Sequence, residues 1–361
     1  MRDQPSDAVG GGDLDALYEA VASWFGVGAL GEALSSAESE TEKTARDWLA
    51  RGGKRWRPFL VACAHEALRA EADAWPAALC RTAVAVECFH KASLIHDDIE
   101  DGDAERYGQE ALHVRLGVPV ALNVGDFLVG EGYRLLGDLA APDERKARMV
   151  RAAAEGHRSL CVGQGRELEA LGNPAPPTPD QVLRIFSGKT APAFEVAVRL
   201  GAALAGADET LWPMLGRYGE ALGVAYQIRD DLEDSWPTGG AGQWCGRRVS
   251  IVLALAYERS VGEARRLLEA AWRSAPAPLG TAARVERILA ELEVEASARR
   301  LLESYRQAAR EALEPAAGRP IGRVLRKAVE RMFEGTLRGR ALADASARRA
   351  VQPRLGAEPA A

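Results

Sequence analysis

The 361-residue sequence has few cysteines and no long apolar run. Its five cysteines are odd in number and scattered, without a C-x-x-C pair, which is typical of reduced thiols and not of a disulfide framework. No apolar segment follows the first charged residues, so we expect no secretory signal. No stretch approaches the roughly 18 apolar residues of a membrane span, so we expect none. These absences predict a soluble, cytoplasmic protein.

Basic charge is also scarce. The chain has 46 Lys and Arg residues against 52 Asp and Glu residues, a formal net charge of −6 at pH 7. A nucleic-acid-binding face needs an excess of basic residues, so no nucleic-acid partner is expected. The net charge does not exclude an anionic ligand, because metal ions held by carboxylates attract anions. Only six of the basic residues are lysines, so each lysine inside a motif is a candidate functional residue.

Helix signals dominate the chain and strand signals are sparse. Apolar side chains recur every three or four residues over windows rich in Ala, Leu, Arg and Glu. The pattern predicts one all-α domain of ten or more helices over residues 13–337, with poorly ordered ends at 1–12 and 338–361. Breaks rich in Gly and Pro at 172–179, 237–246 and 275–280 are expected to be loops within that domain. Examples of windows expected to be helical are Leu14–Val27, Pro58–Leu68, Trp75–Ile95, Val118–Leu139, Pro179–Ala205, Glu209–Ile228, Val249–Tyr257 and Arg284–Leu313.

The pattern Asp-Asp-x-x-Asp occurs twice, each time after the apolar residues of a predicted helix. Residues four apart share a helix face, so two carboxylates of each motif stack without a Lys at i+4. Divalent cations with oxygen ligands relieve such repulsion, and Mg²⁺ takes one or two carboxylates plus phosphates. One acidic cluster is typical of a solvated face, but two of the same design indicate a metal site. The six candidate ligands are Asp97, Asp98, Asp101, Asp230, Asp231 and Asp234.

The paired motifs resemble those of the trans-isoprenyl diphosphate synthases of the polyprenyl synthetase family. The resemblance runs from about Gly52 to Tyr257 and more weakly beyond. It implies an all-α isoprenoid-synthase-type bundle around a central apolar cavity, usually as a homodimer. It also implies condensation of an allylic diphosphate with isopentenyl diphosphate, with roughly three Mg²⁺ ions per site on the aspartate oxygens.

Other motifs extend the resemblance to the substrates. Lys54 and Arg57 lie in the basic stretch G-G-K-R-W-R-P, and the family assigns both, with His90, to the isopentenyl diphosphate site. The positions that match family residues for the allylic diphosphate are Arg106, Lys189, Thr190 and Gln227, with Arg248 or alternatively Arg247 further on. Lys189-Thr190 is not part of a Walker loop, because Leu183 occupies the position of that motif's first glycine.

Two further sets of residues have roles implied by the family. Gln164 and Glu167, in G-Q-x-x-E, are expected to orient water or metal ligands from the second shell. Ala92 and Ser93 are small residues four or five positions before Asp97, where farnesyl-type members carry bulky aromatics. Their size implies a product of about twenty carbons or longer, since one helical turn is close to one isoprene unit. Alternatively, the Phe89 side chain, two turns before Asp97, closes this chain-length pocket.

The chain departs from the family pattern at three places. Tyr107 replaces a second arginine that grips isopentenyl diphosphate, Glu110-Ala111 replaces Pro-Thr, and the stretch 235–246 has no Lys. Because tyrosine cannot supply a charged bidentate fork, two other functions stay open. One is ionisation of an allylic diphosphate for cyclisation or transfer to another acceptor, as in terpene synthases. The other is a non-catalytic partner subunit, against which the six retained carboxylates argue.

Overall fold

The computed structural model describes residues 14–34, 36–69, 77–236, 248–273 and 280–334. Helices make up nearly all of the regular structure in these ranges, and a single short hairpin pairs Glu105–Arg106 (β1) with Gln109–Glu110 (β2). The helices are α1 Leu14–Ser23, α2 Val27–Ala33, α3 Glu40–Ala50, α4 Trp56–Glu66, α5 Ala77–Asp101, α6 Leu112–Leu116, α7 Val118–Gly137, α8 Asp143–Leu171, α9 Pro179–Lys189, α10 Ala191–Leu204, α11 Trp212–Ser235, α12 Ile251–Arg259, α13 Gly262–Arg273, α14 Thr281–Glu291, α15 Val294–Ala312 and α16 Pro320–Phe333, with 3₁₀ turns at Glu209–Leu211 and Glu314–Ala316.

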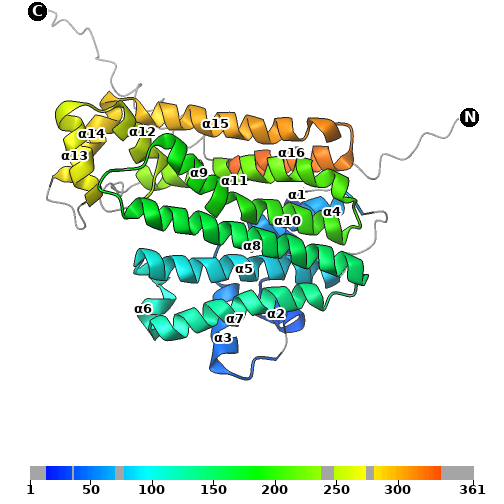
Figure 1. Ribbon diagram of the computed structural model, residues 1–361. Helices are drawn as coiled ribbons and strands as arrows, with labels where there is room; N and C mark the ends of the chain where they lie inside the picture. The colour runs from blue at the N-terminus through cyan, green and yellow to red at the C-terminus, as the bar shows by residue number, and fades with distance from the viewer. Residues whose placement is uncertain (1–13, 35, 70–76, 237–247, 274–279, 335–361) are drawn as a thin grey trace, which may run out of the picture.

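The helices stack in layers around α10 (Figure 1). Helix α15 packs on α11 and α11 on α10, which also contacts α4, α5, α8 and α9; α5 then packs on α7 and α7 on α3. Most residues of α10 are buried, since its sequence is apolar apart from Glu195 and Arg199, which pair with each other. The predicted all-α bundle is confirmed. Among the described helices, none has the length and apolar character that crossing a bilayer requires.

Glycines permit the closest helix crossings. A Cβ atom on Gly163 of α8 would lie 2.2 Å from the carbonyl carbon of Gly188 in α9, so these two backbones touch. In the same way, Gly223 of α11 lies against the backbone of Ala191, and Gly201 of α10 against the carbonyl oxygen of Val61. The α8–α9 contact has a functional consequence, because it fixes the end of α9, where Lys189 is the last residue.

Several predicted helix boundaries differ from the structure. The window 179–205 is two helices divided at Thr190, because Pro192 is the second residue of α10, in the first turn where a missing N–H does no harm. The window 284–313 is divided near Glu293, whose φ of 50° is left-handed. The windows given as examples do not cover α2, α3, α6, α8, α13 or α16, and the hairpin was not predicted. The predicted ends 1–12 and 338–361, the loop 237–246 and most of the loop 275–280 lie outside the described residues.

The glycine contact on α8 can be tested by paired substitutions. Gly163→Ala should lower the free energy of unfolding by about 1–3 kcal/mol, because its methyl group overlaps the α9 backbone. Gly165→Ala on the same helix has nothing within 4 Å of its new Cβ and should raise it by about 0.5–1 kcal/mol. Urea denaturation measures both. Equal effects of the two substitutions would contradict the contact.

Candidate active site

Both aspartate motifs lie in the last turns of buried helices. Helix α5 ends at Asp101 and α11 ends at Ser235, one residue after Asp234, and neither helix has a basic residue in its last turn. A helix carries partial negative charge at its C-terminus, so carboxylates there are locally unfavourable. Cationic groups outside these last turns must therefore offset the charge of both motifs.

The first motif is held by α9 and the hairpin. The Nζ atom of Lys189 lies 3.3 Å from Oδ1 of Asp97 and also pairs with Glu167 of α8. The Nε of Arg106 in β1 donates to Oδ1 of Asp98 at 2.7 Å. Although its side chain is exposed, desolvation by the surrounding protein and the carboxylates of Asp97 and Glu167 raise the pKa of Asp101 to about 6. Burial opposes the charge of Lys189, but the neighbouring carboxylates prevail and raise its pKa to about 12.

The second motif is held by its own helix and by the segment before α12. Arg229 pairs with Asp230 at 2.9 Å, and Arg248 pairs with Asp234 at 2.6 Å. Asp231 also contacts the next helix: its Oδ2 accepts a hydrogen bond at 2.7 Å from the backbone N–H of Ile251, the first residue of α12. Burial raises the pKa of Asp231 to about 7.

A chain of polar contacts joins the two motifs. Thr190, next to Lys189, donates to Oε1 of Gln227 at 2.9 Å, and Nε2 of Gln227 lies 3.4 Å from Asp231. Gln164 of α8 donates to Glu100 of α5 at 2.5 Å. The structure therefore connects residues expected at the allylic diphosphate and metal sites, although they come from four helices and the segments between helices.

A basic group lies beside these motifs at the start of α4. The guanidinium of Arg57 is 3.1 Å from Nε2 of His90 and 4.7 Å from the centroid of the Phe194 ring. Burial and the nearby positive charges hold the pKa of His90 far below its usual value, so the neutral imidazole accepts this hydrogen bond. Lys54 reaches the second motif's helix, with its Nζ 3.4 Å from Oε2 of Glu233.

The six carboxylates divide into two kinds by exposure. The side chains of Asp98 and Asp231 are nearly enclosed, at 1% and 4%, and each has a partner that holds it. The side chains of Asp97, Asp230 and Asp234 are 22%, 32% and 49% exposed. Asp101 is exposed too, and it lies one turn from Asp97 on the same face.

The exposed carboxylates fit divalent cations. Asp97 and Asp101 are stacked oxygen donors, and Mg²⁺ needs only one or two such ligands when phosphates supply others. In the described part of the chain, no three His, Cys, Asp or Glu side chains converge as a complete metal cage. In the structure Asp97, Asp230 and Asp234 pair instead with Lys189, Arg229 and Arg248.

Residues 38–240 match the polyprenyl synthetase family. The chain belongs to this family. It is a prenyltransferase, and divalent metal ions bind the diphosphates in such enzymes. It is 36% identical over 249 residues to geranylgeranyl diphosphate synthase of Mycobacterium tuberculosis, covering 67% of this chain and 68% of that protein. It is 35% identical over 238 residues to farnesyl diphosphate synthase of Escherichia coli, covering 62% and 77%.

Solved structures of polyprenyl synthetases have the same fold. The geranylgeranyl pyrophosphate synthetase of Geoglobus acetivorans superposes with a TM-score of 0.76 at 26% identity, covering 88% of this chain and 99% of that one. The polyprenyl synthase of Caulobacter crescentus, solved with calcium and isoprenyl diphosphate, gives 0.74 at 25% identity, covering 90% and 98%.

Sequence reasoning missed three charged residues next to the predicted site. Lys91 and Glu87 are buried in α5, and Arg55 is buried at the start of α4, where it pairs with Glu87 at 2.5 Å. The sequence did carry a signal for Glu87 and Lys91. Both are charged residues inside an otherwise apolar helical window, and the chain has only six lysines. Of the two open positions at 247 and 248, Arg248 contacts the second motif and Arg247 lies outside the described residues.

The predicted chain-length residues lie on α5 before Asp97. The Phe89 ring packs edge-on against the Tyr133 ring of α7, with 4.8 Å between the two ring centroids. The Tyr133 hydroxyl is 3.2 Å from Nδ1 of His157 in α8. Ser93 is partly exposed, one turn before Asp97, whereas Ala92 is only 1% exposed. An aromatic cluster thus lies two turns from the first motif.

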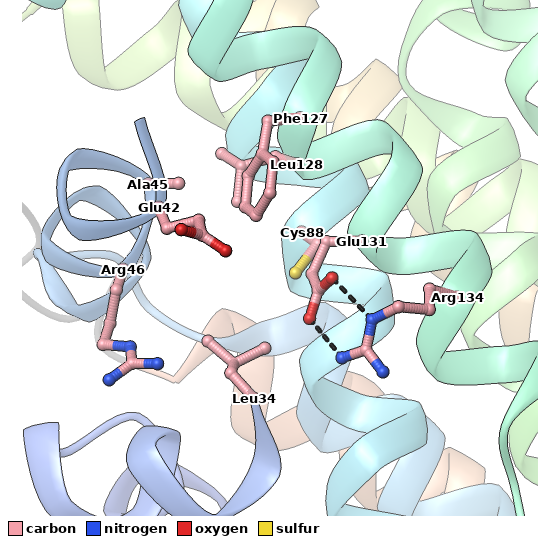
Figure 2. A pocket seen from close by; sticks show the side chains of 9 residues that line it. All are labelled: Leu34, Glu42, Ala45, Arg46, Cys88, Phe127, Leu128, Glu131 and Arg134. Atoms are coloured by element: carbon pink, nitrogen blue, oxygen red, sulfur yellow. Dashed lines mark hydrogen bonds and ion pairs between the residues drawn. The ribbon is translucent and has the colours of Figure 1, made fainter. Parts of the chain in front are cut away.

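A separate cavity of about 240 Å³ lies between α2, α3, α5 and α7. Figure 2 shows that Glu131 and Arg134 form a bidentate pair at one side, next to the Cys88 thiol, with Leu34 and Phe127 among the apolar lining. None of its lining residues belongs to the aspartate motifs or to the basic group. The cavity is therefore not the predicted site.

The two kinds of aspartate should respond differently to substitution. Asp101→Asn should reduce kcat/KM by about 100-fold or more, because a metal ligand is lost, while stability is unchanged or rises as repulsion is relieved. Asp98→Asn should lower the free energy of unfolding by about 1–3 kcal/mol, because Arg106 loses its charged partner.

Activity assays and urea denaturation measure both substitutions. A large stability loss in Asp101→Asn, or none in Asp98→Asn, would contradict the division.

Proposed function

We propose that the chain condenses an allylic diphosphate with isopentenyl diphosphate to give a trans-polyprenyl diphosphate. The observation that supports this most is the juxtaposition of two sites. The carboxylate motifs are linked through Lys189, Thr190 and Gln227, and a separate basic group is formed by Lys54, Arg57 and His90. One site suits a metal-bound diphosphate and the other suits a diphosphate bound by basic side chains.

The allylic diphosphate would lie between α5 and α11. Asp97, Asp101, Asp230 and Asp234 would hold Mg²⁺, roughly three ions per site, while Asp98 and Asp231 keep Arg106 and α12 in place. Bound Mg²⁺ would supply Lewis-acid stabilisation of the leaving diphosphate. Lys189, Arg106 and Arg248 would bind its oxygens, with Thr190 and Gln227 as hydrogen-bonding neighbours.

Isopentenyl diphosphate would bind at the start of α4. Lys54 and Arg57 would contact its diphosphate, and His90 would orient the Arg57 guanidinium. Bond formation follows when its double bond attacks the allylic cation, and the released diphosphate takes up the departing proton. Gln164 and Glu167 would act indirectly, since Glu167 already holds Lys189.

The product would have about twenty carbons or more. The small side chain of Ser93 leaves space beside α5 before Asp97. The cluster of Phe89, Tyr133 and His157 is the next bulky group, about one turn further away. Ala92 is buried in the core, so Ser93 and Phe89 carry this assignment.

The enzyme would act as a homodimer in the cytoplasm. Large apolar side chains are exposed along α6, the start of α7 and one side of α8, and a second copy of the chain would cover them. They are Val114, Leu116, Val118, Val120, Leu122, Val162 and Leu168.

One observation favours a second function, ionisation without isopentenyl diphosphate. Tyr107 lies against the loop before α4, where a Cβ on Gly52 would be 3.1 Å from its ring, and its phenol offers one hydrogen bond and no charge. A weakened isopentenyl diphosphate site would leave the allylic cation to cyclise or to meet another acceptor.

Incubation with Mg²⁺ and a labelled allylic diphosphate, with and without isopentenyl diphosphate, tests these alternatives. We expect longer diphosphates, of about twenty carbons or more, only when both substrates are present, because chain growth adds one isoprene unit per turn of helix available. Hydrocarbon products from the allylic substrate alone would establish the second function. No turnover, but binding to a related subunit, would indicate a non-catalytic partner.

A further inference from the structure

Lys91 is a buried cation next to the predicted isopentenyl diphosphate site. It follows His90 on α5, is 0% exposed, and donates from Nζ to the carbonyl oxygens of Arg51 at 2.7 Å and Gly52 at 3.0 Å. Burial lowers its pKa to about 7, and the nearby carboxylate of Glu87 opposes that shift. A buried ammonium without hydrogen-bond acceptors is strongly unfavourable, so these two carbonyls and this side chain depend on each other.

Arg55 binds the same stretch of backbone from the other direction. Its guanidinium donates to the carbonyl oxygens of Leu49, Ala50 and Arg51, at 2.9, 3.2 and 2.9 Å, and pairs with Glu87. Four consecutive carbonyls, from residues 49 to 52, therefore point toward two buried cations. In a trans peptide the N–H of the next residue points the opposite way.

Because these carbonyl groups point inward, the N–H groups of the loop that follows them point outward. Gly52, Gly53 and Lys54 are exposed, and within the described part of the chain the N–H groups of Gly52 and Gly53 donate to no other residue. Gly53 has a φ of 109°, which favours glycine. Successive free amides beside a lysine form a concave site for an anion.

Aromatic side chains enclose Lys91 on the remaining sides. Its Nζ lies 4.1 Å from the centroid of the Tyr107 ring and 5.6 Å from that of Trp48, whose indole N–H donates to the Lys91 carbonyl at 3.1 Å. The Tyr107 ring also covers Gly52. Lys91 cannot reach a substrate through this enclosure, so any effect on binding is transmitted through the loop 52–54.

We propose that Lys91 is a positioning residue for the second diphosphate: by anchoring the carbonyls of Arg51 and Gly52, it aims the loop amides and Lys54 at isopentenyl diphosphate. This assignment rests on the proposed function. Tyr107 is then the aromatic cover of the anchor, which explains how a neutral residue is accommodated beside the loop.

The test compares Lys91→Met with Leu79→Ala, a cavity-forming change at another fully buried position of α5. Lys91→Met should raise KM for isopentenyl diphosphate by about tenfold or more, because an unanchored loop binds the diphosphate poorly, with KM for the allylic substrate within about twofold. Leu79→Ala should lower stability without changing the ratio of the two KM values. Lys91→Gln, which keeps donors for the carbonyls, should fall between wild type and Lys91→Met.

Equal changes in both KM values, or no change, would overturn the inference. If Lys91→Met does not fold, Lys91→Gln is compared with wild type by the same criterion.

Should wild type fail to use isopentenyl diphosphate, the proposed function fails, and titration with inorganic pyrophosphate without metal tests the anchor separately. Without metal the carboxylates repel pyrophosphate, so it should bind at the basic group, about fivefold or more weaker in the variant; equal binding would reject the anchor.

Discussion

The central constraint in this protein is the crowding of six carboxylates at the C-terminal ends of two buried helices. Neither the helix dipoles nor the last turns of α5 and α11 favour negative charge there. Several parts of the fold serve to offset it. The glycine contact between α8 and α9 sets Lys189 beside Asp97, and the hairpin carries Arg106 to Asp98.

The cationic side chains offset this negative charge only in part, and the uncompensated part suits the site to binding cations. The side chains of Asp98 and Asp231 are enclosed: Asp98 accepts a hydrogen bond from Arg106, and Asp231 accepts one from the first backbone N–H of α12. Asp97 and Asp101 share one lysine and keep exposed oxygens. Under the proposed function, their residual negative charge would bind divalent cations and a diphosphate, at the expense of the stability of the unliganded protein.

Much of the site could be predicted from the sequence because its residues follow local rules. The i, i+4 spacing of each aspartate pair and the proximity of Lys189 and Thr190 are properties of short segments. The division of the aspartates could not be predicted, since it depends on Arg106 and Ile251, which reach the motifs through tertiary packing. The role of Lys91 was hidden for the same reason.

Helix boundaries failed where one residue overrode periodicity. Apolar spacing continues through Thr190, but Pro192 begins a new helix there, and Glu293 divides α14 from α15 in a left-handed conformation. Helix α8 escaped prediction because much of its surface is polar and its buried side includes Gly163 and Gln164, which carry no apolar signal.

Thermal unfolding with Mg²⁺ and inorganic pyrophosphate, added singly and together, tests the unsatisfied charge of the carboxylates most directly. We expect a large rise in Tm only when both are present, because the metal ions need phosphate ligands and the anion needs the metal ions. The rise should be lost in Asp101→Asn, while the Tm of that variant without ligands equals or exceeds that of wild type. An equal joint rise in Asp101→Asn, or an unliganded Tm well below wild type, would contradict the account.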